Sequence, residues 1–516
     1  TSRNQGRTAQ RMNILAAKLI GETVRTTLGP QGMDKMIVDG LGDVTITNDG
    51  ATILREMNIE HPTAKMIVEI AKTQEHEVGD GTTTAVVLAG ELLKQAEKLI
   101  EQNIHPTTII KGYRIASQKS QTILANMSEP LKATQKALLK KLAMTAITGK
   151  VADEAKEDLA DLVVQALGSV QEGEKQHLKH IKIETKVGAP IKDTELIKGI
   201  VLDKEKVHNN MPTKVMQAKI ALIDSPLEVR NTDTDAKISV HNPDEYQAFL
   251  NMEENMLRDL VKKITSSGAN VVLCQKGIDD VVQYLLAQEG IYACRRVKKS
   301  DLQHVAMATG GHIITNVKDL EKKHLGSAGK VTQEEIGDEY MTFIQEAKQP
   351  KAVTLLVRAM TSHIAEEVKR ALDDAIGNVA SALRAGSVVG GAGSVEMELA
   401  RNLGLYSQKL SGKEQLAVQA FSEAMEIIPR TLAENAGLDP VDILVELKSQ
   451  HDKGKKWAGI DVFTGKNLDA LAKGIVEPLP VKTHAVKAAA DVAIMILRID
   501  DVIIAGGEEQ TPQPEY

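Results

Sequence analysis

Aromatic side chains and cysteines are scarce in this chain of 516 residues, which contains four Phe, one Trp, seven Tyr and two Cys. Because so few rings are available, a buried core has to be built from aliphatic side chains and Met. The two cysteines, Cys274 and Cys294, stand alone in apolar, strand-like segments. Two isolated cysteines provide neither a disulfide framework nor a zinc site, and they favour a reducing cytosol.

Long hydrophobic runs are absent as well. No apolar stretch approaches the roughly 18 to 20 residues that span a bilayer, and the opening residues contain no apolar signal-peptide segment. We therefore expect a cytoplasmic protein with no membrane partner. An excess of basic charge is also lacking, since the formal net charge is −7. This argues against nucleic acid as a partner, because general affinity for phosphates comes from Lys and Arg.

The two ends of the sequence have helical periodicity, whereas strand-like and helical segments alternate in the middle. The strand-like segments cover residues 219–223, 270–275, 292–297, 312–315 and 352–358. The helical segments cover residues 243–264, 279–288, 300–309, 366–384 and 415–434. Alternation in the middle is typical of an α/β domain. We therefore expect a multi-domain α and α/β fold, in which both chain ends build one helical domain around an inserted α/β domain.

Near the start of the chain the pattern predicts an amphipathic helix. Its expected apolar face consists of Met12, Leu15, Leu19 and Ile20. Gly29 and Pro30 are expected to end this helix, since a glycine follows the last turn and a proline cannot continue it. A short strand pair at residues 36–38 and 44–47 follows, and Pro62 opens the next helix.

The sharpest chemical motif is Gly-Asp-Gly-Thr-Thr-Thr at residues 79–84. Glycines let a backbone approach a phosphate closely, and the N-terminus of the following helix has unpaired amides and a positive dipole end. Asp80 can hold Mg²⁺, a hard cation that takes one or two carboxylates together with phosphate oxygens. The structural alternative is an ordinary helix-breaking turn in which a Thr caps the helix.

Other clusters have a structural and a functional interpretation. Residues 28–30, Leu-Gly-Pro, are more typical of a helix stop than of a ligand loop, and residues 48–50, Asn-Asp-Gly, are more typical of a hairpin turn. Asp373 and Asp374 lie in a predicted helix, where adjacent acids usually face solvent. A carboxylate in such a position can also orient water for attack on a γ-phosphate.

Motifs of several common enzyme classes are missing. Gly149-Lys150 is followed by Val151, so there is no Walker-type loop, and the glycine cluster at 390–393 lacks the dinucleotide pattern because position 396 is Glu. No His-Glu-x-x-His or Cys-x-x-Cys sequence occurs either. A P-loop ATPase, a Rossmann dehydrogenase and a zinc protease are therefore disfavoured.

Six motifs nevertheless occur in the order and with the spacing of one family. They occupy residues 26–36, 47–54, 79–84, 275–280, 373–375 and 428–437. In this combination the sequence closely resembles the group II chaperonins, the family of the archaeal thermosome subunits and the eukaryotic cytosolic chaperonin (TCP-1). The resemblance covers essentially the whole chain.

The resemblance implies an ATP-dependent chaperone, an ATP-hydrolysing subunit of two stacked rings that encloses non-native client proteins and closes a built-in lid. Ring neighbours would be identical or paralogous subunits, eight or nine per ring. The implied domains are an equatorial ATP-binding domain at 1–140 and 390–516, an intermediate hinge domain at 141–206 and 357–389, and an apical client-binding domain at 207–356. A helical protrusion at about residues 231–264 would form the lid.

The resemblance also implies ATP and Mg²⁺ as ligands, and roles for individual residues. Asp374 matches the family's catalytic Asp and would position the attacking water, with Asp49 assisting near the γ-phosphate. Asp80 would coordinate Mg²⁺, and Lys150 matches a lysine that senses the γ-phosphate. Glu477 matches an acid that binds ribose hydroxyls. The other implied nucleotide contacts are Thr27, Leu28, Gly29, Pro30, Asn48, Gly81, Thr82, Thr83, Thr84, Gly391, Ala392, Gly393 and, near the base, Asp461.

Two positions depart from the family pattern. Gln31 stands where a Lys or Arg is usual, which removes a positive charge near the phosphate loop, and we expect a modest loss of affinity. Ala392 replaces the central glycine of its loop. An alanine keeps the amide donor but disfavours positive φ, so we expect its contact to persist only if residue 392 has negative φ.

Three functions stay open from the residues themselves. They are an ATP-hydrolysing chaperonin, a metabolic phosphotransferase whose middle domain binds a small substrate, and an assembly scaffold with an inactive ATP site. The presence of Asp49, Asp80 and Asp374 argues against the scaffold. For the helix at 243–264 the alternatives are a lid, with a tip near Phe249 and Met252 exposed to partners, and a plain buried amphipathic helix.

Overall fold

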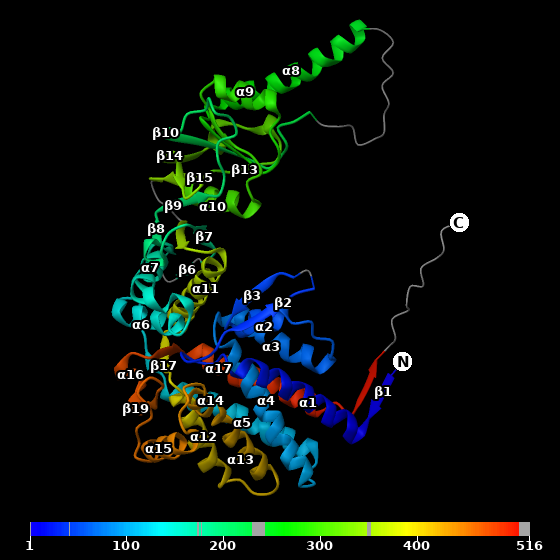
Figure 1. The fold of residues 1–516 in the computed structure, drawn as a ribbon, viewed down its shortest axis with the longest axis vertical. Helices are drawn as coiled ribbons and strands as arrows, with labels where there is room; N and C mark the ends of the chain where they lie inside the picture. Colours follow the sequence, from blue (N-terminus) through cyan, green and yellow to red (C-terminus); the bar gives the residue numbers. More distant parts are fainter. Residues whose placement is uncertain are drawn as a thin grey trace, which may run out of the picture. The chain divides into compact units, whose positions relative to one another are not determined.

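The computed structural model of the chain describes residues 2–40, 42–172, 175–176, 178–229, 243–347 and 352–504. Two compact units are present, one from Thr1–Ala160 with Arg370–Tyr516 and one from Asp161–Lys369 (Figure 1). Both chain ends therefore fold together, and the middle of the chain forms the second unit. The division into three domains, with a hinge at 141–206 and 357–389, stays a prediction.

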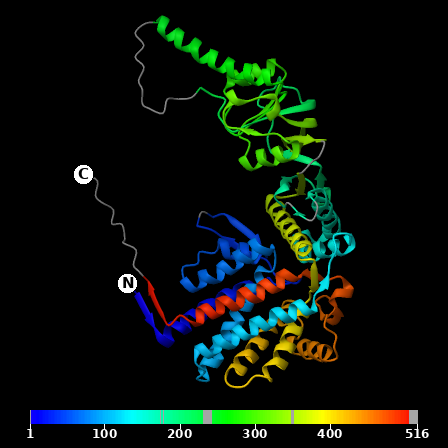
Figure 2. The ribbon, with the colours of Figure 1, turned by 180° about the vertical axis from the view of Figure 1, so that it is seen from behind.

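The first unit is a stack of long helices. Helices α1 (Gly6–Arg25), α4 (Thr82–Glu101) and α17 (Leu479–Leu497) pack against one another, and α4 and α17 also contact α5 (Pro106–Met127). Figure 2 shows the blue N-terminal helix beside the orange-red C-terminal one. The other helices that begin in this unit are α2 (Gly50–Glu56), α3 (Pro62–Val78), α6 (Lys136–Ile147), α7 (Lys156–Ser169), α12 (Ser394–Ser407), α13 (Glu414–Met425), α14 (Ile427–Asn435), α15 (Pro440–Asp452) and α16 (Ala470–Lys473).

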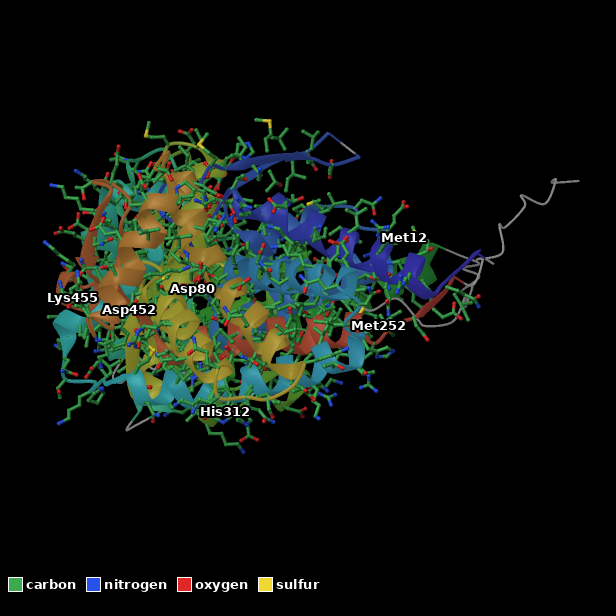
Figure 3. The ribbon with its side chains drawn as sticks, turned by 90° about the horizontal axis from the view of Figure 1, so that it is seen from below. Met12, Asp80, Met252, His312, Asp452 and Lys455 are labelled. Atoms are coloured by element: carbon green, nitrogen blue, oxygen red, sulfur yellow. The ribbon has the colours of Figure 1, made fainter. Side chains whose placement is uncertain are left out.

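The helix predicted at the start of the chain exists as α1, but of its predicted apolar face only Ile20 is buried. Met12, Leu15 and Leu19 are 43%, 53% and 59% exposed, and Met12 is labelled in Figure 3. The buried face carries Ile14, Ile20 and Val24 together with small residues such as Gly21, where an added Cβ would be in van der Waals contact, 3.5 Å from the Cα of Gly90 in α4. Burial of these aliphatic side chains and the close approach of α1 to α4 at Gly21 and Gly90 together set the orientation of α1.

One predicted helix is divided in two. Residues 415–434 form α13 and α14, with Glu426 between them. Pro429 explains the break, because a proline has no N–H to donate to the carbonyl four residues earlier, that of Met425.

Short sheets bring distant segments of the first unit together. Strand β1 (Ser2–Gln5) pairs with β21 (Asp501–Ile504), and the predicted hairpin is confirmed as β2 (Lys35–Val38) with β3 (Val44–Thr47). A three-stranded sheet joins β4 (Glu129–Pro130), β17 (Ser387–Gly390) and β20 (Val476–Pro478), and it sets Glu477 opposite Val389. The last pair is β18 (Ala458–Asp461) with β19 (Lys466–Asp469).

The second unit is an α/β domain around a mixed sheet of seven strands. Its path is β12-β11-β10-β14-β15-β9, with β13 paired to β10, and β10 runs parallel to β11 and β13 but antiparallel to β14. The strands are β9 (Gly199–Leu202), β10 (Lys214–Ile223), β11 (Val271–Cys274), β12 (Tyr292–Cys294), β13 (Ile313–Ile314), β14 (Gly326–Ile336) and β15 (Glu339–Gln345). The predicted strands in this region are confirmed, whereas the long hairpin β14–β15 was not predicted.

Helices cover both faces of this sheet. Leu273 and Cys294 pack in one cluster with Leu302 of α10 (Lys299–Thr309), whereas Cys274 packs in another with residues of α8 (Pro243–Ser267) and α9 (Asp280–Gln288) such as Ile264. Adjacent residues of one strand thus serve opposite faces. The remaining elements are β5 (Gln171–Glu172), β6 (Lys175–Gln176), the sheet of β7 (Ile181–Val187), β8 (Glu195–Ile197) and β16 (Val353–Ala359), α11 (Ser362–Ala385), and short 3-10 helices at Val151–Ala155, Leu178–His180, Ile191–Asp193, Val317–Asp319 and Lys322–His324.

Helix α8 combines the two alternatives weighed for it. Its C-terminal half is buried at Leu257, Val261 and Ile264, whereas Phe249 and Met252 are 38% and 54% exposed. The first part of the predicted protrusion, residues 231–242, lies outside the described residues. The role of this segment as a lid stays a prediction.

Tyr113 of α5 is one of the few rings in the aliphatic core, and it provides a test of the packing. The side chain is fully buried, its hydroxyl donates to the carbonyl of Leu92 over 2.6 Å, and its ring meets Phe421 edge to face at 5.4 Å. We predict that Tyr113→Phe destabilises the first unit by about 1 kcal/mol, because the donor is lost while the ring packing remains. Thermal unfolding measures this. Tyr340→Phe, at a 46% exposed ring, is the control, and equal midpoints for the two variants would contradict the prediction.

Candidate functional site

The first unit contains a cavity of about 430 Å³, a size usual for small-molecule ligands. Nearly all of the site residues predicted from the sequence line this cavity. Those that line it are Thr27, Leu28, Gly29, Pro30, Asn48, Asp49, Asp80, Gly81, Thr82, Thr83, Thr84, Lys150, Asp374, Ala392, Gly393, Asp461 and Glu477. Gly391 does not line it, but it adjoins the wall: a Cβ at this residue would lie 2.8 Å from Oε1 of Glu477.

The loop after α1 is both a helix end and a wall of the cavity. Gly29 has a φ of +83°, and a Cβ there would lie 2.3 Å from a methyl carbon of Leu432. Asn435 of α14 donates its side-chain amide to the carbonyl of Leu28 over 2.8 Å. The helix-stop interpretation and the ligand-loop interpretation of residues 28–30 are therefore compatible.

The N-terminus of α4 opens toward the same cavity. Its N-cap is Gly81, with a φ of +79°, and no side chain caps it. The alternative of a turn capped by a Thr is therefore wrong. The amides of Thr82, Thr83 and Thr84 stand at the positive end of a 20-residue helix and line the cavity, an arrangement that attracts anions.

Residues 48–50 do not form a hairpin turn but the start of α2. Asp49 caps this helix, since its Oδ2 accepts from the amide of Thr52 over 2.7 Å. Asn48 donates to the carbonyl of Gly149 over 3.2 Å, and its Oδ1 is buried with no hydrogen-bond partner among the described residues. A buried acceptor of this kind suits a donor supplied by a ligand or a water.

Lys150 and Asp374 form an ion pair across the cavity wall, and their side chains are 17% and 22% exposed. Burial raises the pKa of the Asp374 carboxyl, the negative charges of Asp49 and Asp80 raise it further, and Lys150 opposes them without cancelling the effect. Burial alone would lower the pKa of the Lys150 ammonium. The nearby carboxylates of Asp374, Asp80 and Asp49 outweigh burial and raise this pKa, so the ammonium stays charged. The adjacent Asp373 is exposed and does not line the cavity.

A buried lysine of the cavity was missed by the sequence analysis. Lys482 of α17 bonds Glu477 over 2.8 Å and Glu396 over 2.9 Å, and its side chain is 5% exposed. Burial, with Glu396 and Asp80 nearby, raises the pKa of Glu477, although Lys482 opposes this. Lys482 stands one turn before the buried Val486, and a charge at such an apolar position was the available signal.

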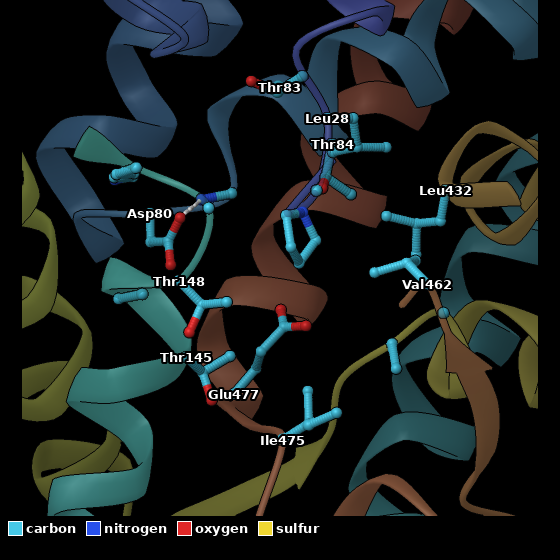
Figure 4. Close-up of a pocket in the computed structure, with 18 of the residues that line it drawn as sticks. Leu28, Asp80, Thr83, Thr84, Thr145, Thr148, Leu432, Val462, Ile475 and Glu477 are labelled. Atoms are coloured by element: carbon cyan, nitrogen blue, oxygen red, sulfur yellow. Dashed lines mark hydrogen bonds between the residues drawn. The ribbon is translucent and has the colours of Figure 1, made fainter. Parts of the chain in front are cut away.

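Asp461 has a local structural role. Its Oδ1 accepts from the amides of Phe463 and Thr464 over 3.0 and 3.3 Å, and these bonds hold its pKa below the usual range although burial opposes them. The hairpin that it stabilises contributes part of an apolar wall and α14 contributes the rest; the sequence analysis did not assign this wall to the site. This wall consists of Ile428, Leu432, Ile460, Val462 and Phe463. Figure 4 shows Asp80 and Thr148 on one side of the cavity and Leu432 and Val462 on the other.

The two departures from the family pattern have different outcomes. Gln31 is exposed and does not line the cavity, so no wall charge is lost there. Ala392 has a φ of +56°, not the negative value on which its contact was expected to depend. Its carbonyl accepts from the amide of Ile460 over 3.0 Å, which fixes this left-handed residue in the loop.

A helical unit built from both chain ends around this cavity, with an α/β unit inserted, defines a chaperonin subunit. The model of the TCP-1/cpn60 chaperonin family matches residues 20–507, and the chain belongs to this family. It is 55% identical to the thermosome subunit beta of Methanothermobacter thermautotrophicus, over 98% of this chain and 93% of that protein. It is 56% identical to a thermosome subunit of Methanopyrus kandleri, over 97% and 92% of the two chains, and 54% identical to one of Pyrococcus horikoshii, over 100% and 94%.

Membership of this family confirms the predicted function, that of an ATP-dependent chaperone and ATPase. It decides against the alternatives of a metabolic phosphotransferase and an inactive scaffold. Within the described residues, no helix has the length and apolar character needed to cross a membrane.

Gly149 holds two walls of the cavity together, which leads to a prediction. Its φ is +81°, and a Cβ at this residue would lie 2.4 Å from the Cα of Pro30. Gly149→Ala should displace the loop after α1 and weaken nucleotide binding about tenfold, since strain on the order of 1–2 kcal/mol has to be relieved. Calorimetric titration with ADP measures the change. Gly40→Ala, where an added Cβ meets nothing within 4 Å, is the control, and full affinity in Gly149→Ala would contradict the prediction.

Proposed function

We propose that this cavity binds ATP with Mg²⁺ and hydrolyses it to drive the chaperone cycle. The observation that carries the proposal is the meeting, in one cavity, of an uncapped helix N-terminus, the carboxylates of Asp49, Asp80 and Asp374, and the charged Lys150. Amides and an ammonium suit phosphates, carboxylates suit a hard divalent cation, and the apolar wall at the opposite end suits a base.

The donors present fit Mg²⁺ bound together with a nucleotide. Among the described residues no group of three or more His, Cys, Asp or Glu side chains is placed to hold a metal ion. Mg²⁺ does not require one, because it usually takes one or two carboxylates and completes its shell with phosphate oxygens and water. Asp80 is the ligand that we assign. When bound, Mg²⁺ neutralises charge that develops on the phosphate oxygens during transfer.

Asp374 is the group that we assign to the attacking water. A carboxylate with a raised pKa accepts a proton more readily than an ordinary one, which suits a residue that orients and deprotonates water. Lys150 holds this carboxylate in place and can instead pair with a phosphate oxygen, so it can exchange one anionic partner for another. Asp49 uses one oxygen to cap α2, which fixes the other beside the phosphate end of the cavity.

Glu477 is the acceptor that we assign to the ribose hydroxyls. Lys482 holds its carboxylate, and the absence of a side chain at Gly391 leaves room for it. Val462 and Phe463 are placed to cover the base, since they belong to the apolar wall.

The family role extends this proposal to the assembly. We propose two stacked rings of identical or paralogous subunits in the cytoplasm, with the apical domain at 207–356 taking non-native clients and the protrusion that includes α8 acting as the lid. The exposed Phe249 and Met252 support a surface that is available to partners at the end of α8. Neither nucleic acid nor a membrane is needed for this function.

The first prediction from this assignment concerns Asp374. Asp374→Ala should bind ATP at least as well as the unmodified protein, because Lys150 is released to pair with phosphate, while turnover falls by about two or more orders of magnitude. Steady-state phosphate release and equilibrium ATP binding separate the two effects. Asp373→Ala is the matched control on the same helix and should keep its turnover. Near-normal hydrolysis by Asp374→Ala would remove this residue from the mechanism.

The second prediction concerns Asp80. Asp80→Ala should weaken ADP binding in the presence of Mg²⁺ by about tenfold or more, and leave binding in EDTA nearly unchanged, because only the metal-dependent part of the affinity passes through this carboxylate. Calorimetric titrations with and without Mg²⁺ provide the comparison. If both affinities stay at their original values, Asp80 is a turn residue and the metal lies elsewhere.

A further inference from the structure

The carboxylate of Asp80 is fixed by hydrogen bonds to both of its oxygens. Oδ1 accepts from the amide of Gly81 over 2.6 Å, the bond drawn as a dashed line in Figure 4, and Oδ2 accepts from Nδ2 of Asn378 over 2.8 Å. The backbone is held as well, since Gln74 donates to the carbonyl of Asp80 over 2.8 Å. An ordinary helix-breaking turn does not require this much support.

Asn378 reaches Asp80 from α11, the helix that also carries Asp374 one turn earlier. Asn378 is completely buried, and its Oδ1 has no hydrogen-bond partner among the described residues. Because an ionised carboxylate can only accept hydrogen bonds, the amide nitrogen has to face Asp80, which leaves the amide oxygen unsatisfied. A buried polar side chain with half of its capacity unused indicates a selected orientation rather than general packing.

Two glycines make this contact possible. A Cβ at Gly79 would lie 3.0 Å from the Cα of Gly377, and a Cβ at Gly377 would lie 3.1 Å from the Cα of Gly79. With glycine on both sides, α11 approaches the loop that carries Asp80 closely enough for the short Asn side chain to span the distance. Gly79 also has a φ of +77°, which favours glycine there independently.

We propose that Asn378 is a positioning residue for the metal ligand: it fixes the rotation of the Asp80 carboxylate so that the remaining lone pairs of this group are presented to Mg²⁺. The proposal rests on the assignment of Asp80 as the ligand in the proposed function. Helix α11 then sets two groups of the reaction at once, Asp374 directly and Asp80 through Asn378. Partners that orient ligating carboxylates usually contribute 10–100-fold to metal affinity or activity.

The competing explanation is that Asn378 only attaches the loop to α11. The two explanations differ in the metal dependence of nucleotide binding. A purely structural bond stabilises the protein but changes ADP affinity equally with and without Mg²⁺. A positioning bond changes the affinity only when Mg²⁺ is present.

The test is calorimetric titration of the assembled full-length protein with ADP, in Mg²⁺ and in EDTA, for four proteins. They are the unmodified chain, Asn378→Ala, Asn378→Leu, which keeps most of the side-chain volume, and Ser381→Ala. Ser381 is a buried residue of the same helix that does not line the nucleotide cavity. We expect the ratio of ADP affinity in Mg²⁺ to that in EDTA to fall about tenfold in both Asn378 variants and to stay unchanged in Ser381→Ala.

The outcomes distinguish the positioning role of Asn378 from the assignment of Asp80 as the Mg²⁺ ligand, on which that role rests. If the unmodified protein shows a large ratio and both Asn378 variants keep it, the positioning role is wrong while the Mg²⁺ site stands. An equal loss of affinity with and without Mg²⁺ also overturns the positioning role. A ratio near one in the unmodified protein overturns the metal assignment of Asp80, and the proposal for Asn378 with it.

Discussion

Backbone segments that cross with no side chain between them are the constraint on which the cavity depends. Gly149 lies against Pro30, Gly50 against Thr83, and at each of these contacts an added Cβ would come within 2.5 Å of a neighbouring atom. The loops bring amides and short polar side chains together only because this space is empty. Longer side chains at the crossings would separate the loop after α1, the start of α2 and the start of α4. The charged groups would then no longer lie close together.

The arrangement of charge follows from this close packing. Two largely buried lysines line the cavity: Lys150 pairs with Asp374, and Lys482 stands between Glu396 and Glu477. Buried ion pairs contribute little net stability, since desolvation offsets most of their attraction. In the function that we propose, a ligand would take over one of the partners, so that the site would accept an arriving anion by exchanging contacts instead of burying a new charge.

Much of the fold could be predicted because its signals are local. Helical periodicity at both ends and alternation in the middle gave the two kinds of domain, and Pro62 and the strand pair after α1 gave correct element starts. The hairpin β14–β15 was missed because it contains glycines and charged residues such as Lys330 and Glu334 and shows no clear alternation. Likewise, nothing in the periodicity indicated that Leu15 would face outward, since that depends on the close approach of α4.

The candidate site was predictable through its motifs and not through its contacts. The motifs supplied most residues of the phosphate side, because glycine-rich loops and acidic residues are recognisable in the sequence, whereas Lys150 lies outside the six motifs. Two residues of the apolar wall, Ile428 and Leu432, lie in the motif at 428–437, but Val462 and Phe463 lie in no motif, since they join the wall only when the hairpin β18–β19 meets α14. Asn378 was missed for the same reason: its partner is distant in the sequence, and a single Asn in a helix has no pattern. An interaction between a single residue and a loop that is distant in the sequence can be recognised only in the structure.

The pairing of β1 with β21 has a consequence for folding of the protein during its synthesis on the ribosome. The second unit, Asp161–Lys369, is continuous in sequence and can fold as soon as its last strand has emerged. The first unit cannot, because its central helices need α17 and its edge needs a strand at residues 501–504. At ordinary elongation rates the remaining stretch takes roughly 7 to 30 s to synthesise. During that interval the helices of the N-terminal half lack the segments against which they pack. A chaperone subunit therefore itself passes through a long, incompletely folded state during synthesis.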